Sequence, residues 1–346
     1  MRYISNEEKS SCNNSFYMQF SDDQRSVASV YPFRITGYYA DLIKTPGDAI
    51  WRQCMPDIRE LSDDTAENDP LAESALSPVP GLIHRYPDRV VLLVSNRCAV
   101  YCRFCMRKRH IGCGDDTPPD SDSLDRSLAY IAATDSIRDV ILSGGDPLLL
   151  DDGSLYDILS KLRTIRHVKI IRIGTRVPVT LPDRVTPELC NILKQFHPLF
   201  INTHFNHPAE ITRSSHYACS LLSDAGIPLG NQTVLLNGVN DTPSVMRELM
   251  SGLLELRVKP YYIHQMDLVR GASHFRTPVA KGLEIIRALR GHITGMAVPH
   301  FVIDLPGGKG KVALLPDQVE REGDVLYFTT YRGERIAYGD IKETRE

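Results

Sequence analysis

Short apolar segments alternate with amphipathic segments from about residue 90 to residue 303, and this rhythm constrains the fold more than any other feature of the sequence. The apolar segments resemble buried strands, and the segments between them have helical periodicity. Such an alternation predicts an α/β fold with a parallel sheet and helices outside it. The predicted strands are residues 90–94, 140–142, 168–173, 199–202, 228–236, 260–263 and 300–303. The predicted helices include residues 124–133, 155–163, 187–195, 245–256 and 279–289.

Polar or glycine residues follow the end of nearly every predicted strand. Parallel strands of a barrel end at one mouth, and that mouth holds the active site, so these residues are expected to converge. A single polar residue after a strand would be ordinary. Such residues after nearly every strand favour a barrel or an incomplete barrel with a site at its mouth. The residues are Cys98, Ser143, Gly144, Gly145, Asp146, Thr175, Arg176, His204, Gln232, Asp267 and Asp304.

Three of the eight cysteines, Cys98, Cys102 and Cys105, lie within eight residues of one another, directly after the first predicted strand. Clustered thiols in a chain without a secretory segment suit a metal or an iron–sulfur cluster better than disulfides. Structural zinc is the alternative, but it prefers four ligands, and no fourth Cys or His lies at a suitable spacing. Cys113 follows a Gly-rich turn and is interpreted as a bystander. Three ligands on a four-iron cluster would leave one iron open.

Composition excludes several classes of protein. Hydrophobic residues make up 42% of the chain and charged residues 24%, with a net charge of −3, so no nucleic-acid partner is expected. The opening residues have no apolar core of a signal peptide, and no segment reaches membrane-spanning length. The sequence therefore predicts a cytoplasmic protein without a membrane partner.

The ends of the chain are expected to differ from its centre. Residues 1–80 contain capping and turn signals among short amphipathic pieces, and residues 63–70 are expected to form a solvated acidic linker. Residues 81–305 would form the barrel. Residues 306–346 would form a short C-terminal β extension, with a hairpin of residues 325–331 and 335–338 that turns at Arg332 and Gly333.

The CxxxCxxC spacing of the three cysteines resembles the cluster motif of radical S-adenosylmethionine enzymes. The wider sequence, from Arg85-Tyr-Pro-Asp-Arg89 to Cys105-Met-Arg-Lys-Arg109, resembles the lysine 2,3-aminomutase family, and the similarity extends from about residue 80 to residue 338. The resemblance implies a partial (β/α)6 barrel, a TIM-like radical S-adenosylmethionine barrel. It also implies a [4Fe-4S] cluster on Cys98, Cys102 and Cys105.

The same resemblance implies an S-adenosylmethionine site. The loop Ser143-Gly144-Gly145-Asp146 matches the family's binding loop, and its glycines would let exposed backbone amides approach a ligand. Arg176 and His204 also match this site. His204 alone could equally be a satisfied core histidine.

A second cofactor, pyridoxal 5′-phosphate, is implied by the string from Asp304 to Lys311, Asp-Leu-Pro-Gly-Gly-Lys-Gly-Lys. A lysine beside a flexible glycine loop can form a Schiff base with an aldehyde. The family's lysine matches Lys311, although Lys309 replaces a glycine of the motif. The phosphate ligands implied by the resemblance are Arg85, Arg89 and Gln232.

The resemblance implies that the enzyme is an isomerase that converts L-lysine to β-lysine. Arg107 would bind the substrate carboxylate, and Asp267 and Asp304 would bind the ε-ammonium group. The alternatives are an arginine or glutamate 2,3-aminomutase, another radical S-adenosylmethionine enzyme without pyridoxal phosphate, or a non-enzymatic metal-binding protein.

The family also implies partners. An electron donor such as flavodoxin or ferredoxin would reduce the cluster. Longer family members hold a subunit-bridging zinc, but Thr242 occupies the matching internal cysteine position here, and the sequence ends without further cysteines. No structural zinc is therefore expected, and a homo-oligomer is left open.

Overall fold

One nine-stranded sheet forms the centre of the molecule. The computed structural model describes residues 3–5, 20–63, 66–112, 121–316, 318–323 and 325–339; Cys113 lies outside them. In space the strands follow the order β11-β10-β9-β8-β7-β6-β5-β4-β3. Their bounds are β3 Leu82–Tyr86, β4 Arg89–Ser95, β5 Asp139–Gly144, β6 Ile170–Gly174, β7 Leu199–Thr203, β8 Leu229–Leu235, β9 Val258–Gln265, β10 His300–Asp304 and β11 Lys311–Leu314.

The sheet is an incomplete barrel. Every neighbouring pair from β4 to β10 is parallel, whereas β3 and β11 pair antiparallel with β4 and β10 at the two edges. The two edge strands stand at opposite ends of the order, so the barrel stays open between them. The predicted α/β fold with a partial barrel is confirmed, with six strand–helix units followed by a seventh parallel strand.

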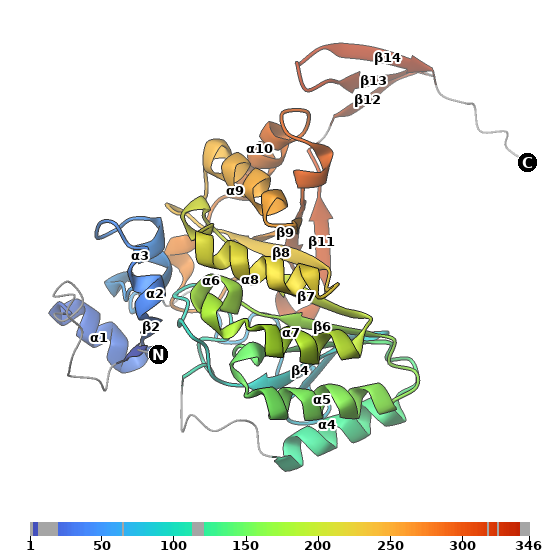
Figure 1. Ribbon diagram of the computed structural model, residues 1–346. Helices are drawn as coiled ribbons and strands as arrows, with labels where there is room; N and C mark the ends of the chain where they lie inside the picture. Colours follow the sequence, from blue (N-terminus) through green and yellow to red (C-terminus); the bar gives the residue numbers. More distant parts are fainter. Residues whose placement is uncertain are drawn as a thin grey trace, which may run out of the picture.

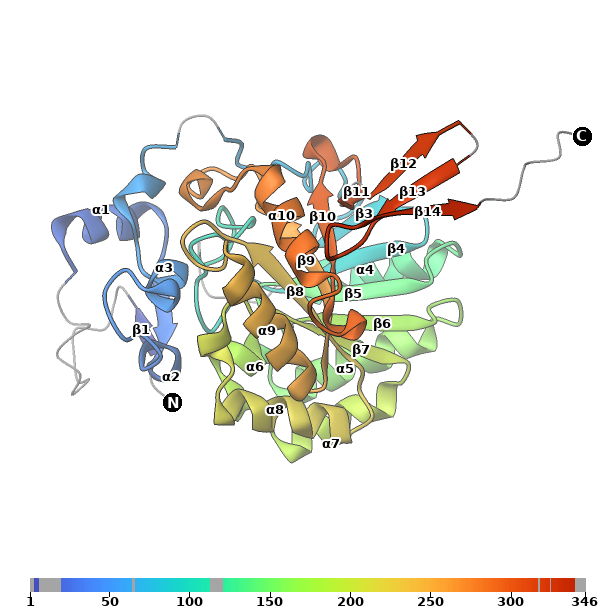
Figure 2. The same cartoon turned by 90° about the horizontal axis from the view of Figure 1, so that it is seen from above.

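A helix covers the outer face of the sheet in each crossover between parallel strands (Figures 1 and 2). The helix α5 illustrates the cause, because Leu155, Ile158, Leu159 and Leu162 lie on one face and are buried in the common core. Threonines at the N-caps of α7, α8 and α9 begin those helices. The bounds are α4 Ser121–Ala133, α5 Asp152–Thr164, α6 Val177–Thr180, α7 Pro187–Leu193, α8 Arg213–Asp224, α9 Pro243–Glu255 and α10 Val279–Leu289.

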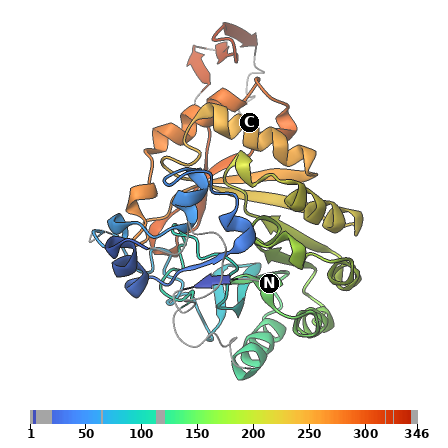
Figure 3. The ribbon, with the colours of Figure 1, turned by 60° about the vertical axis from the view of Figure 1, so that its left-hand side comes forward.

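The N-terminal elements pack against the loop that carries the cysteines. In Figures 1 and 2 they lie on the opposite side of the barrel from the C-terminal sheet, and Figure 3 brings them in front of the barrel. Backbone hydrogen bonds join the two regions, from Tyr101 N to Arg34 O at 3.0 Å and from Arg103 N to Gln53 O at 2.9 Å. The elements are β1 Tyr3–Ser5, α1 Asp22–Val30, β2 Arg34–Thr36, α2 Gly37–Ala40, α3 Ala49–Cys54 and the 3-10 helix Ile58–Glu60.

The expected solvated linker at residues 63–70 is wrong in its described part. Asp63 is buried, and its carboxylate accepts hydrogen bonds from the backbone amides of Gly271 and Ser273 at 2.9 and 3.1 Å. Asp69 forms an ion pair with Arg109 at 2.9 Å. These two acidic residues anchor the segment. Asp63 accepts hydrogen bonds from backbone amides, and Asp69 pairs with Arg109, which follows the clustered cysteines.

The C-terminal residues form a separate three-stranded sheet that projects from the barrel (Figures 1 and 2). Its strands are β12 Val319–Glu322, β13 Val325–Thr329 and β14 Arg335–Gly339. The predicted hairpin is confirmed as β13 and β14, and β12 adds a strand that the prediction did not include. No helix among the described residues is long and apolar enough to cross a membrane.

A buried charge cluster links the N-terminal region to the cysteine loop. The Glu60 carboxylate accepts hydrogen bonds from Arg103 Nε and Nη2 at 2.9 and 2.6 Å and from Lys108 Nζ at 2.6 Å. All three side chains are buried. Although burial alone would raise it, the pKa of Glu60 is lowered, because the two neighbouring cations stabilise the carboxylate. This cluster fixes the position of residues 103–108.

We predict that Glu60→Gln lowers the free energy of unfolding by roughly 3–5 kcal/mol, because it leaves two buried cations without their counter-charge. Chemical denaturation of the full chain measures this loss. Asp125→Asn is the matched control, because Asp125 pairs with Lys161 on an exposed surface and should cost about 0–1 kcal/mol. Equal stability of the Glu60 variant and the wild type would contradict the assigned role.

Candidate active site

A cavity of about 1290 Å³ occupies the inside of the open barrel. It is lined by residues from the starts of strands, such as Asp139 and His300, and by residues at their C-terminal ends. The cavity therefore runs the length of the strands. With the exception of Asp267, all of the predicted site residues line it: Arg85, Arg89, Cys98, Cys102, Cys105, Arg107, Ser143, Gly144, Gly145, Asp146, Arg176, His204, Gln232, Asp304 and Lys311.

The three clustered cysteines follow β4 and face this cavity as free thiols. Burial and the nearby Asp146 carboxylate raise the pKa of the Cys98 thiol well above its usual range, and burial raises the pKa of Cys105 to about 11. Cys98 and Cys105 therefore need a positively charged ligand to stabilise their thiolate forms. Among the described residues, no three His, Cys, Asp or Glu side chains could hold a metal ion together. A four-iron cluster binds each cysteine through a different iron, so it suits more widely spaced thiols.

The loop from Ser143 to Asp146 packs closely against the segment that leads to the cysteines. A Cβ atom at Gly144, whose φ is +115°, would lie 2.2 Å from Ser95 O, and one at Gly145 would lie 2.3 Å from Arg97 O. The expectation that these amides are free for a ligand is wrong for Gly145 and Asp146, because they donate to the same two carbonyls at 2.5 and 2.7 Å. The glycines allow two backbone segments to meet.

The Asp146 side chain also serves the protein scaffold. Its carboxylate accepts hydrogen bonds from Thr175 Oγ1 and from the backbone amide of Arg176, both at 2.6 Å. These bonds connect the loop after β5 to the loop after β6. Asp146 thereby positions Arg176 at the cavity wall.

The Arg176 guanidinium points at one of the clustered thiols. Its Nη1 lies 2.8 Å from Cys102 Sγ, and its Nη2 donates to Glu210 Oε1 at 2.8 Å and to Gln53 Oε1 at 2.6 Å. His204 borders the same region, where its Nε2 contacts Asn206 Oδ1 at 3.1 Å. Burial and the nearby Arg176 lower the pKa of His204 well below its usual value, so its imidazole is neutral at pH 7.

Arg107 has a carboxylate partner inside the protein. Its Nε and Nη2 donate to both carboxylate oxygens of Glu73 at 2.9 and 2.7 Å, and its Nη1 donates to Ser143 Oγ at 3.0 Å. Three of the five donor hydrogens of a guanidinium thus meet acceptors among the described residues. Two remain for a ligand in the cavity.

Lys311 lies where the edge strand β11 pairs with the end of β10. Its Nζ donates to Asp304 Oδ2 and lies 3.3 Å from His264 Nδ1 on β9. Burial alone would raise the pKa of Asp304, but His264 and Lys311 hold it well below its usual value. Lys309 is exposed and does not line the cavity. The geometry therefore separates the two lysines of the glycine-rich string.

The predicted phosphate ligands line the same cavity. Arg85 Nη1 lies 3.4 Å from Asp304 Oδ1, and Arg85 Nε is buried without a hydrogen-bond partner in the described structure. Arg89 begins β4, and its guanidinium lies 3.8 Å from the centre of the Tyr86 ring. Gln232 lies on β8 next to Tyr262 of β9. These groups present two cations and an amide to the cavity.

Asp267 follows β9 and does not line the cavity, although it is electrostatically coupled to residues that do. Burial raises its pKa to about 7, and the Asp304 carboxylate contributes to this rise. Lys311 and Arg85 oppose it. At neutral pH Asp267 is therefore poised between its acid and its carboxylate.

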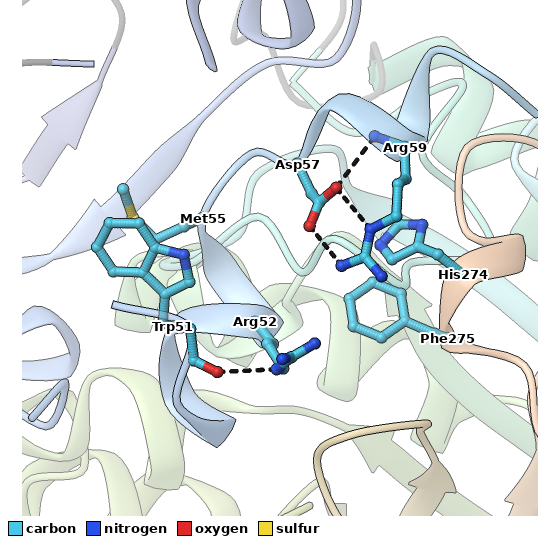
Figure 4. Close-up of a pocket in the computed structure, with 8 residues that line it drawn as sticks. Trp51, Arg52, Met55, Asp57, Arg59, His274 and Phe275 are labelled. Carbon is cyan, nitrogen blue, oxygen red and sulfur yellow. Dashed lines mark hydrogen bonds and ion pairs between the residues drawn. The ribbon is translucent and has the colours of Figure 1, made fainter. Parts of the chain in front are cut away.

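A second cavity lies between α3 and the loop after β9, but it measures only about 100 Å³ (Figure 4). Trp51, Arg52 and Phe275 contribute to its wall, and the ion pair of Asp57 and Arg59 closes one side. This volume is too small for a nucleoside or a pyridine cofactor. The large cavity is thus the candidate active site.

Several residues of the site were not predicted from the sequence. Glu73, His264, Gln53, Glu210 and Tyr39 all contact predicted site residues. All of them except His264 are isolated polar residues that belong to no recognisable sequence motif. His264 alone carried a local signal, because it lies three residues before Asp267 at the end of a predicted strand.

Comparison with known families agrees with this geometry. The profile of the Radical SAM superfamily matches residues 92–249, and a profile described as Lysine-2,3-aminomutase matches residues 286–325. The first spans the cysteines and most of the parallel strands. The second spans Asp304 and Lys311.

Three relatives cover most of the chain. The L-lysine 2,3-aminomutase of Fusobacterium nucleatum is 55% identical over 82% of this chain and 68% of that protein. The L-lysine 2,3-aminomutase of Clostridium subterminale is 52% identical over 88% of this chain and 74% of that protein. The glutamate 2,3-aminomutase of Clostridioides difficile is 45% identical over 91% of this chain and 75% of that protein. The chain therefore belongs to the lysine 2,3-aminomutase family of radical S-adenosylmethionine enzymes.

Proposed function

We propose that this chain is an L-lysine 2,3-aminomutase, which converts L-lysine to β-lysine (3,6-diaminohexanoate) by moving the α-amino group to carbon 3. One observation carries the proposal. A single cavity is lined by three clustered cysteines and by a lysine beside a buried carboxylate, with a second carboxylate coupled to it. The cavity thus offers a site for a cluster on cysteines, for a cofactor bound to a lysine and for a cationic side chain.

As a member of its family the chain uses a [4Fe-4S] cluster, S-adenosylmethionine and pyridoxal 5′-phosphate. When bound, the first two supply hydrogen-abstracting radical chemistry, and the third supplies a conjugated system next to the migrating nitrogen. The cysteines fit a cluster because three free thiols from one short loop face one cavity. In our proposal Cys98, Cys102 and Cys105 hold it, with Arg176 and His204 beside the S-adenosylmethionine.

The residues around Lys311 fit pyridoxal phosphate. Arg85 Nε and His264 Nε2 are buried polar atoms without hydrogen-bond partners in the described structure, as expected where an absent ligand supplies the partner. We assign Lys311 to the aldehyde, and Arg85, Arg89 and Gln232 to the phosphate. The exposure of Lys309 outside the cavity supports the choice of Lys311 over Lys309.

The substrate would be held at both ends. Two free donor hydrogens of Arg107 suit the α-carboxylate, and Glu73 fixes the orientation of the guanidinium. Asp304 and Asp267 suit the ε-ammonium, because a buried cation needs a negative partner. Two carboxylates would repel the side-chain carboxylate of glutamate. Arginine remains the closer competitor, because a guanidinium also pairs with carboxylates.

The partners in this proposal are a small-molecule substrate and an electron donor such as flavodoxin or ferredoxin, with no nucleic acid and no membrane. A reducing compartment such as the cytoplasm suits the described cysteines, which are free thiols. A homo-oligomer is supported by exposed apolar side chains on the projecting sheet, among them Phe328, Ile336 and Tyr338.

Turnover of lysine, arginine and glutamate by the reconstituted protein under reducing, anaerobic conditions tests the proposal. We expect β-lysine as the main product, because the α-carboxylate and the ε-ammonium group of lysine suit the two ends of the cavity. Chromatographic analysis of the amino acids provides the measurement. Turnover of glutamate or arginine but not lysine would refute the assignment.

The cluster assignment gives a second prediction. Replacement of Cys98, Cys102 or Cys105 by Ala should remove the bound iron and S-adenosylmethionine cleavage, because each thiolate holds its own iron. Cys190→Ala is the control, because Cys190 is a buried thiol on α7 outside the cavity. Iron analysis and the yield of 5′-deoxyadenosine provide the measurements. Full iron content in any of the three variants would disprove its role as a ligand.

The perturbed carboxyl group gives a third prediction. Only the ionised form of Asp267 attracts the ε-ammonium, so kcat/KM for lysine should rise as pH increases through about 7. Asp267→Asn should lose this rise and about 2 kcal/mol or more of transition-state stabilisation. The pH profiles of both proteins decide the matter. An unchanged profile in the variant would show that Asp267 does not contact the substrate.

A further inference from the structure

His264 lies beside the lysine that the proposed function assigns to pyridoxal phosphate. We propose that His264 is a further catalytic residue, which takes a proton from Lys311 Nζ when this nitrogen bonds to the cofactor aldehyde and returns it when the bond is broken. The inference rests on the proposed function, because it requires Lys311 to be the attachment site.

Three adjacent strands bring the two residues together. His264 on β9 is in register with Val302 of β10, and Asp304 of β10 is in register with Lys311 of β11. The Lys311 Nζ and His264 Nδ1 atoms are 3.3 Å apart, and the Asp304 Oδ2 atom lies 3.3 Å from the same ring nitrogen. The contact therefore follows from strand pairing within the sheet.

The arrangement favours His264 over Asp304 as the proton acceptor. A lysine nitrogen needs a free electron pair before it can form a bond to carbon. Asp304 is closer, but its contacts with His264 and Lys311 lower its pKa, so it is a weak base. Burial keeps the His264 imidazole neutral, which leaves a lone pair at one of its ring nitrogens.

The proton transfer is balanced within this group of residues. The proton leaves Lys311 Nζ and binds His264 Nδ1, and the electron pair on Nζ would form the bond to the aldehyde carbon. The aldehyde oxygen would leave as water with the two hydrogens that remain on Nζ. The imidazolium then donates its Nδ1 hydrogen to the Asp304 carboxylate, which offsets the new charge. His264 Nε2 is buried without a hydrogen-bond partner in the described structure, so a hydrogen on this atom would be available to an acceptor on a bound ligand.

The other charged groups around His264 are compatible with this role. Lys311 on β11 lowers the pKa of His264 and Asp304 on β10 raises it, whereas burial has the largest effect and lowers it. The Tyr262 ring on β9 packs edge-on against the imidazole, with 5.4 Å between the ring centres. His204, in the loop after β7, is electrostatically coupled to His264 and is itself neutral.

The rate at which pyridoxal phosphate binds covalently to the cofactor-stripped full-length chain tests the inference. This rate is followed by absorbance, and borohydride reduction with peptide mapping identifies the lysine. We expect His264→Gln to slow the attachment to Lys311 at least tenfold, because an amide cannot accept the proton. His216→Gln is the matched control, since His216 is exposed on α8 outside the cavity and its replacement should leave the rate unchanged.

Chemical rescue separates a catalytic role from a structural one. In His264→Gly, free imidazole in the buffer should restore the attachment rate, because it can occupy the space of the missing ring. A wild-type rate in His264→Gln would overturn the inference, and so would a slow rate that imidazole does not restore. A pyridoxyl group on Lys309 of the wild type would instead overturn the proposed function together with this inference.

Discussion

The parallel pairing of β4 to β10 is the constraint on which the rest of the site depends. It brings the loops after successive strands to one end of an open barrel, so residues far apart in sequence meet there. Cys98 follows β4 and Arg176 follows β6, yet both reach the same cavity. The antiparallel edge strand β11 adds Lys311, which therefore lies across from Asp304 at the end of β10. The cavity combines a cysteine loop and a reactive lysine because both edges of the open sheet contribute to its wall.

Burial of charge is the second organising principle. Each assigned cation of the cavity that lies deep in the protein has a carboxylate partner: Arg107 pairs with Glu73, Arg176 with Glu210, and Lys311 with Asp304. An unpaired buried charge would be costly, so the protein supplies the opposite charge before a ligand arrives. The pKa values of Asp304 and Asp267 shift in opposite directions for a related reason. The direct contacts with His264 and Lys311 lower the pKa of Asp304, whereas burial raises the pKa of Asp267.

The sequence predicted the strands, most of the helices and the projecting hairpin, because their apolar patterns are local. It did not predict the edge strand β3, whose residues include His84, Arg85 and Tyr86 and lack an apolar pattern. Nor did it predict the contact of Glu60 with Arg103, since no local pattern pairs residues so far apart in sequence. Gly144 and Gly145 show a further limit. A glycine pair predicts that another group approaches the backbone closely, but it does not identify that group. Here the group is a neighbouring segment of the protein and not a ligand.

The central claim is that one cavity serves a cluster and a lysine-bound cofactor in the same chain. The most direct measurement is the cofactor content and absorption spectrum of the anaerobically reconstituted wild-type protein. The account predicts about four irons and one pyridoxal phosphate per chain, with absorbance from both groups in one sample. Protein that binds the cluster fully but takes up no pyridoxal phosphate would contradict the account and would indicate a radical enzyme of another reaction type.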